Sequence, residues 1–201
     1  MTTPSMKLGL WLVLLSSVGC ASHVHDEAAY AQAARSDPRR FPYVIGVADV
    51  VRITVWKDPT LSTDAIVRPD GTITMPLVGE LRAAGRTAAE LQKEAEPRLA
   101  AFVKDAVLTV SIVEVNSYRF TVAGNVEHPG LFNSRSYLTV SEALALAGGP
   151  TRYASTSDIV IVRTMQNGTQ QRIPIDYDAI LSGRAPQQDI VILAGDAVRV
   201  P

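Results

Sequence analysis

The spacing of apolar side chains after residue 42 predicts several strands. Apolar and polar residues alternate through residues 50–56, as in a strand with one buried face. Residues 65–68 and 72–76 have the same β-branched character and flank Asp70-Gly71. This dipeptide favours a hairpin turn because glycine accepts a positive φ. The pattern therefore predicts a strand followed by a hairpin.

A helix is predicted next. Thr87 and Glu90 have the spacing of a capping box, in which the two side chains bind the first free amides of a helix. Four apolar residues then share one face at helical spacing: Leu91, Ala95, Leu99 and Phe102. Pro97 lies among them and is expected to kink or end the helix. A strand follows at residues 107–115, so this part of the chain is a small α+β unit.

A second unit has the pattern of a β-grasp domain. A capping box at Thr139 and Glu142 begins a short helix, and Gly148-Gly149 is a typical helix end. Strand character occurs in four segments: residues 119–124, 158–163, 171–175 and 195–201. Asn167-Gly168 predicts a hairpin between the middle two. Strand pairs around one short helix favour the β-grasp, or ubiquitin-like, arrangement.

Two short segments resemble each other. Residues 46–53 and 195–200 each place an aspartate before a strand, Asp49 and Asp196, where a carboxylate can accept hydrogen bonds from nearby amides. The similarity indicates a shared way of beginning a strand and is too short to show a duplicated domain.

The N-terminus has the pattern of a secretory signal. Lys7 precedes an apolar run at residues 8–18, which is too short for a hydrocarbon core that needs about 20 residues. Ser17-Val18-Gly19-Cys20 resembles the bacterial lipoprotein signal, in which cleavage between Gly19 and Cys20 leaves a lipidated cysteine. An ordinary signal peptide with a nearby cysteine is the alternative. The resemblance therefore predicts that residues 1–19 are a signal peptide.

Residues 20–42 are expected to be a lipidated tether. Cys20 is the single cysteine of the chain. The residue after it is Ala21 and not aspartate, a pattern that resembles lipoproteins sent to the outer membrane. His23 and His25 could bind a metal ion, but no further ligands follow at suitable spacing, so a solvated tether is preferred and no metal site is predicted.

Composition excludes several classes of protein. The 201 residues are 47% hydrophobic, which excludes a disordered chain. Lys+Arg 19 against Asp+Glu 20 excludes a strongly basic nucleic-acid binder, so no nucleic-acid partner is expected. One cysteine excludes an intrachain disulfide framework.

Residues with catalytic potential are scarce. His128 is the one histidine outside the tether, and no hydrolase, zinc-protease or phosphate-loop motif is present. Asp49, Asp70 and Asp196 are explained as turn and strand caps. Trp56 and Tyr118 could stack on sugars, but packing is the preferred interpretation. The residues predict no enzyme, no cofactor and no catalytic site, and they leave the ligand-contacting residues unknown.

Two sets of motifs resemble bacterial polysaccharide export proteins. Residues 43–56 and 69–79 are similar to the periplasmic domain of that family, and residues 122–130 and 139–149 to its soluble-ligand-binding β-grasp domain. Ala48 departs from the family, which usually has glycine there. The resemblance implies domains at residues 43–117 and 118–201.

The resemblance also implies a function. Such proteins are outer-membrane lipoproteins that form rings, commonly octamers, through which capsular or exopolysaccharide passes from an inner-membrane copolymerase or chain-length regulator. The chain stops at Pro201 without the membrane helix of longer members. We therefore expect it to build the periplasmic part only, with a separate outer-membrane β-barrel or a longer homologue completing the crossing. The alternatives are a monomeric periplasmic glycan-binding or scaffold lipoprotein and, least favoured, a glycan hydrolase.

Overall fold

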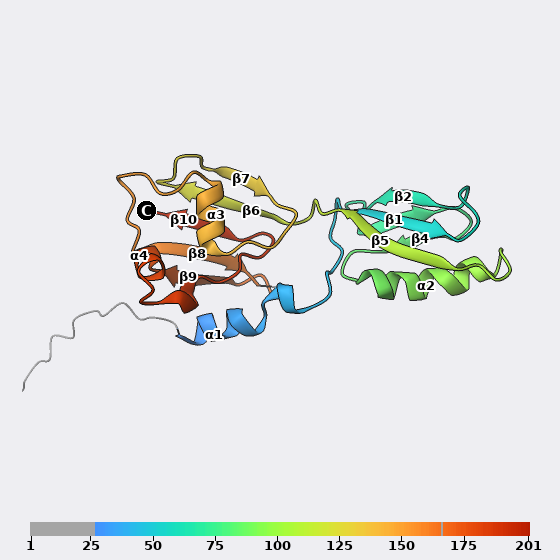
Figure 1. The fold of residues 1–201 in the computed structure, drawn as a ribbon, viewed down its shortest axis with the longest axis horizontal. Coiled ribbons are helices and arrows are strands. Elements are labelled where there is room, and N and C mark those ends of the chain that lie inside the picture. Colours follow the sequence, from blue (N-terminus) through green and yellow to red (C-terminus); the bar gives the residue numbers. More distant parts are fainter. Residues whose placement is uncertain (1–26, 166) are drawn as a thin grey trace, which may run out of the picture.

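The fold has two lobes (Figure 1), and each has a hydrophobic core of its own. The structure is a computed structural model and describes residues 27–165 and 167–201. Helices and mixed sheets alternate along the chain, which confirms the α+β class. Two segments join the lobes and are together called the neck: residues 41–49 before β1 and residues 115–118 between β5 and β6.

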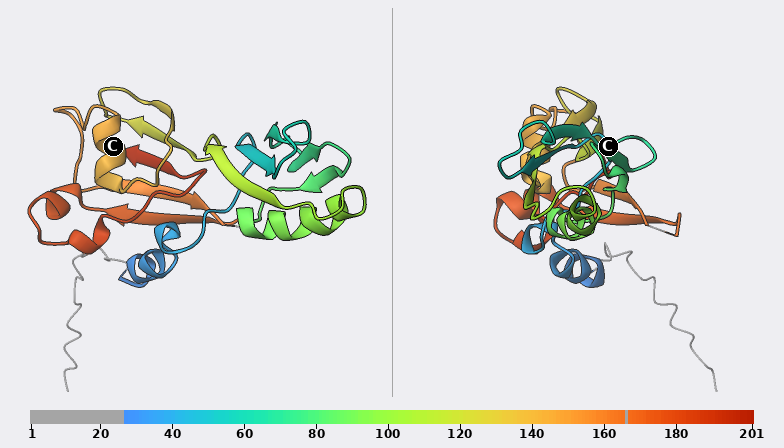
Figure 2. Two further views of the ribbon diagram at one scale, coloured as in Figure 1. Left: turned by 45° about the vertical axis from the view of Figure 1, so that its right-hand side comes forward. Right: turned by 90° about the vertical axis from the view of Figure 1, so that its right-hand side faces the viewer.

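The N-terminal lobe contains five strands and one long helix. They are β1 (Val50–Val55), β2 (Thr63–Ile66), β3 (Thr72–Met75), β4 (Gly79–Arg82), α2 (Ala88–Ala100) and β5 (Leu108–Glu114). An antiparallel sheet has the order β2-β1-β5, and β3 and β4 form a separate hairpin. In β1 the apolar side chains are buried and alternate with exposed ones, as the sequence predicts. Helix α2 packs along β5 (Figure 2).

The pairing around Asp70-Gly71 differs from the prediction. The turn exists, because the amide of Gly71 donates to the carbonyl of Arg68 at 2.8 Å and Gly71 has a φ of 82°. However, β2 pairs with β1, and β3 pairs with β4, so the two runs that flank the turn belong to different sheets. The predicted hairpin is wrong because Val67 bonds to the backbone of Ala48 and Asp49 and thereby continues the pairing with β1.

The first capping box is confirmed, but the end of its helix is not. The amide of Thr87 donates to Glu90 at 2.8 Å, and the amide of Glu90 donates to the Thr87 hydroxyl at 3.2 Å. Helix α2 continues past Pro97 to Ala100, since a proline in the last turn removes one backbone bond only. Phe102 lies beyond the helix end and is 64% exposed, so its predicted inward position is wrong.

The C-terminal lobe is a β-grasp fold. Its elements are β6 (Arg119–Gly124), β7 (Gly130–Asn133), α3 (Val140–Leu146), β8 (Ile159–Thr164), β9 (Gln170–Ile175), α4 (Tyr177–Leu181), a 3₁₀ helix η2 (Pro186–Gln188) and β10 (Ala197–Val200). The sheet order is β7-β6-β10-β8-β9, with β10 parallel to β6 and the other pairs antiparallel. The second capping box and the hairpin around Asn167-Gly168 are confirmed. Helices α4 and η2 were not predicted from the sequence.

A helix lies within the segment that was expected to be a solvated tether. Helix α1 (Glu27–Arg35) and the 3₁₀ helix η1 (Pro38–Arg40) precede the N-terminal lobe. Nevertheless, α1 packs on the C-terminal lobe (Figure 1). Its buried residues, Ala29, Tyr30 and Ala33, belong to the core of that lobe. The expectation of a fully solvated tether is therefore wrong for this helix, whose small apolar face is covered.

The similarity between residues 46–53 and 195–200 has a structural counterpart. In each case a four-residue turn ends at the aspartate, whose carboxylate accepts from the amide three residues earlier, Gly46 at 2.7 Å or Leu193 at 2.8 Å. The third residue has a positive φ, 75° at Ala48 and 86° at Gly195. The departure at Ala48 thus puts a side chain where glycine is favoured.

Replacing Ala48 with glycine should stabilise the N-terminal lobe. A left-handed backbone costs an L-residue about 1–2 kcal/mol, and glycine avoids this cost. Part of the gain is offset, because glycine has more conformational freedom in the unfolded chain. We expect Ala48→Gly to raise the free energy of unfolding by about 0.5–1 kcal/mol, measured by chemical denaturation. Gly195→Ala is the matched reverse change and should destabilise. A destabilised Ala48→Gly variant would contradict this account of the turn.

Candidate functional site: the neck and the N-terminal helix

One buried carboxylate ties together the two backbone connections of the neck. Asp49 is completely buried. Its Oδ1 accepts from the amides of Asn116 and Ser117, both at 2.8 Å. Its Oδ2 accepts from the Gly46 amide at 2.7 Å, the Tyr43 hydroxyl at 2.6 Å and the Ser117 hydroxyl at 3.1 Å. The segment that leads into β1 is therefore bound to the segment that leads out of β5.

Burial matters for this cluster because its donors have little access to water. Tyr43 is half-buried beside Asp49, and burial together with the hydrogen bond to this carboxylate raises the pKa of the Tyr43 hydroxyl above its ordinary value. The hydroxyl therefore keeps its proton and donates to Asp49. The cap expected at Asp49 is confirmed: the carboxylate closes its own turn through Gly46 and also binds the segment that follows β5.

Aromatic rings continue the contact into the C-terminal lobe. The rings of Tyr43 and Tyr137 lie 6.5 Å apart, and those of Tyr137 and Tyr118 lie 5.1 Å apart in an edge-to-face arrangement. The Tyr118 hydroxyl donates to the carbonyl of Ile192 at 3.0 Å. Tyr118 is buried, so its interpretation as a packing residue is confirmed. Trp56 is 70% exposed, and the packing expected of it is wrong.

Helix α1 is held on the C-terminal lobe by one tyrosine and small residues. The Tyr30 hydroxyl donates to the carbonyl of Pro174 in the edge strand β9 at 2.5 Å. Pro174 cannot donate a backbone hydrogen bond, and prolines in sheets are typical of edge strands. Helix α1 thus covers part of an edge that would otherwise be open to another chain.

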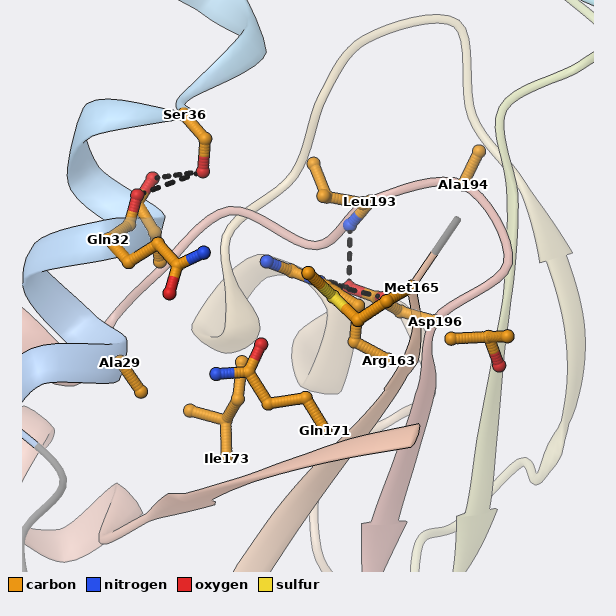
Figure 3. A pocket seen from close by; sticks show the side chains of 12 residues that line it. Ala29, Gln32, Ser36, Arg163, Met165, Gln171, Ile173, Leu193, Ala194 and Asp196 are labelled. Atoms are coloured by element: carbon orange, nitrogen blue, oxygen red, sulfur yellow. Dashed lines mark hydrogen bonds and ion pairs between the residues drawn. The ribbon is translucent and has the colours of Figure 1, made fainter. Parts of the chain in front are cut away.

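A cavity of about 290 Å³ lies between α1 and the sheet (Figure 3). Its floor holds Arg163, which forms an ion pair with Asp196 at 2.7 Å and donates to the carbonyl of Val191 at 3.1 Å. Both side chains of the pair are nearly buried. Gln32 of α1 and Gln171 of β9 point into the same space from opposite walls. The cavity therefore has polar groups on its floor and on the walls formed by α1 and β9.

The other residues singled out from the sequence lie outside the described residues or elsewhere in the fold. Gly19, Cys20, His23 and His25 lie outside the described residues. The Asp70 side chain accepts from the amide of Thr72 at 2.9 Å, which confirms its role as a cap. His128 is exposed in a turn. Residues 27–165 and 167–201 contain no acidic, histidine or cysteine cluster suited to a metal ion. Among these residues, no helix has the length and apolar character needed to cross a membrane.

Four residues around α1 were not singled out from the sequence: Tyr30, Gln32, Arg163 and Gln171. The similarity between the two turns indicated Asp196, but its partner Arg163 lies 33 positions earlier in another strand, and no local pattern joins them. The alanines around Tyr30 were a usable signal, because Ala29, Tyr30 and Ala33 share one helix face.

Both lobes match families of known proteins. Residues 37–113 match the polysaccharide biosynthesis/export protein family, and residues 119–174 match the SLBB domain. The chain belongs to the polysaccharide export protein family. The N-terminal lobe is hereafter the export domain, and the C-terminal lobe is the SLBB domain.

Three curated relatives illustrate the similarity. The EPS I polysaccharide export outer membrane protein EpsA of Ralstonia solanacearum is 28% identical over 79% of this chain and 48% of its own length. The exopolysaccharide production protein ExoF of Rhizobium meliloti is 30% identical over 66% and 34%. The capsule polysaccharide export protein BexD of Haemophilus influenzae is 27% identical over 77% and 42%. The chain thus spans less than half the length of these relatives.

Removing the charge of Asp49 should destabilise the neck. In Asp49→Asn an amide group faces donors that need an acceptor, and a buried donor without a partner costs about 1–3 kcal/mol. We expect the free energy of unfolding of the export domain to fall by about 2–4 kcal/mol, measured by denaturant titration.

The matched control for this prediction is Asp64→Asn. Asp64 forms an exposed pair with Arg52 at 2.6 Å, and such pairs contribute about 0–1 kcal/mol. If the two variants lose equal stability, Asp49 does not have the central role described here.

Proposed function

We propose that this protein is a periplasmic, outer-membrane-anchored component of a ring that exports capsular or exopolysaccharide across the outer membrane. The observation that carries the proposal is the order of an export domain and an SLBB domain on one chain, together with relatives named for polysaccharide export. Transport through a ring needs a hydrated passage and no covalent chemistry. The chain's nearly neutral charge suits a passage that does not hold its cargo.

The proposed anchor is a lipid on Cys20, exposed by cleavage after Gly19. Only residues 21–26 separate Cys20 from α1, so an extended chain lets the cysteine reach about 25 Å from Glu27. Helix α1 packs on the SLBB domain. An anchored protein would therefore hold its SLBB domain close to the membrane, and the export domain would extend from the neck into the periplasm.

The proposed ring forms by side-by-side association of copies, with an octamer as the expected size. Two edge strands support such contacts. Ile66 on β2 is 64% exposed and Leu131 on β7 is 66% exposed. An open edge with an apolar side chain is the kind of surface that pairs with another chain. The inner-membrane copolymerase would meet the export domain, and a partner protein would complete the outer-membrane crossing.

Deletion and complementation test the export function together with the anchor. Cells without the gene should lose surface polysaccharide and accumulate its precursor. The wild-type gene should restore export, whereas Cys20→Ser should fail, because its protein lacks the acyl chains that stabilise membrane attachment. Labelled palmitate and membrane fractionation report the lipid, and Ser22→Ala is the matched control. Unchanged surface polysaccharide after deletion would refute export, and a membrane-bound Cys20→Ser protein would refute the anchor.

Mass measurement in mild detergent tests the ring. The wild-type protein should have a mass of several subunits. Ile66→Asp and Leu131→Asp should shift it toward the monomer, since a charge at the contact must lose its water. Leu181→Asp is the control, because Leu181 is equally exposed at 67% but lies on α4, away from both edges. A strict monomer at high concentration would refute the ring and favour a glycan-binding or scaffold lipoprotein.

A further inference from the structure

The cavity beneath α1 contains hydrogen-bonding groups that the protein itself does not use. Within the described part of the chain, the side-chain amides of Gln32 and Gln171 have no hydrogen-bond partner. Arg163 uses its Nε and Nη2 on Asp196 and Val191, which leaves the N–H groups of Nη1 for another acceptor. Figure 3 shows the guanidinium reaching toward the side of the cavity formed by α1. These three side chains come from α1, β8 and β9.

The other walls of the cavity are mainly apolar, and its charge is balanced. Six apolar residues line it, together with the hydroxyl residues Ser36 and Thr164: Ala29, Ala33, Met165, Ile173, Leu193 and Ala194. Among the described residues that line it, Arg163 and Asp196 are the charged side chains, and they neutralise each other as an ion pair. A charged ligand would have to compete with this pair, whereas a neutral polar ligand would not.

We propose that this cavity binds one uncharged sugar unit. A pyranose ring has an apolar C–H face for the aliphatic walls and hydroxyls that both donate and accept. The amides of Gln32 and Gln171 can do the same, and Arg163 can donate to a hydroxyl oxygen. A volume of about 290 Å³ is at the small end of ligand pockets, which run from about 300 to 1,000 Å³, so it holds one ring.

This inference goes beyond the proposed export function. Passage through a ring requires no fixed sugar site, so export can occur whether or not the cavity binds a sugar. The site would give the SLBB domain a weak, local contact with glycan. Because α1 supplies one wall, the contact also depends on the N-terminal segment being docked.

Saturation-transfer NMR on the full-length protein tests the site. The probes are the methyl glycosides of glucose, galactose and mannose, with methyl glucuronoside as the charged comparison. The detergent must have no sugar headgroup, because maltosides would compete. At least one neutral glycoside should receive magnetisation from the protein, and the glucuronoside should bind more weakly. Oligosaccharides cut from the cell's own polymer identify the source of the sugar. If the site takes a sugar unit of the polymer, these oligosaccharides should bind as well. If it takes a free monosaccharide, they should not.

Variants locate the binding. Gln171→Leu and Gln32→Leu should each weaken it about fivefold to tenfold, the loss expected for one or two neutral hydrogen bonds. Gln170→Leu is the matched control, because neighbouring strand residues face opposite sides and Gln170 is exposed. Thermal unfolding checks the fold of each variant, and α1 and β9 provide independent tests.

Three results would overturn the proposal. The first is no transfer to any neutral glycoside at the highest soluble concentration. The second is stronger binding of the glucuronoside, which would assign the cavity to anions. The third is equal weakening by Gln170→Leu and Gln171→Leu, which would place the sugar elsewhere. None of these results concerns surface polysaccharide in cells, so they are distinguishable from a failure of the export function.

Discussion

The hydrogen bonds of Asp49 fix the path of the chain between the two domains. The carboxylate joins the backbone of Gly46 to that of Asn116 and Ser117, and Ser117 lies 68 positions after Asp49 in the sequence. Without it, two single strands of backbone would connect two separate cores, and each could rotate independently. With it, both connections are closed into one unit, against which the rings of Tyr43, Tyr118 and Tyr137 pack. The relation between the domains therefore depends on one buried group more than on a broad interface.

A second buried aspartate performs a related task in the SLBB domain. Asp196 closes the same type of turn as Asp49, but its remaining hydrogen-bonding capacity goes to Arg163. One turn design thus has two outcomes. At the neck the carboxylate binds backbone amides of a distant loop, and in the SLBB domain it holds a guanidinium under a cavity. The two carboxylates differ because the fold places backbone amides beside Asp49 and the guanidinium of Arg163 beside Asp196.

Features that depend on neighbouring residues were predictable from the sequence. Both capping boxes, the alternation in β1 and the Asn167-Gly168 hairpin follow from contacts within a few positions. The pairing of β2 with β1 was not predictable, because Asp70-Gly71 specifies a turn and leaves the partner strand open. Helix α1 was missed because it is nine residues long and has little apolar area of its own. In the candidate site, Asp49 and Asp196 could be found as caps, whereas their distant partners require the tertiary fold.

The docking of α1 also determines how mechanical load would travel through an anchored molecule. The export domain follows α1 in sequence, but α1 packs on the SLBB domain (Figure 1). A force applied at the N-terminal end would therefore act first on the contact between Tyr30 and β9, and it would not reach the neck while that contact holds. Thermal agitation of a lipid tail would in the same way be damped at the SLBB sheet. The angle between the domains would then be insulated from the movements of the membrane.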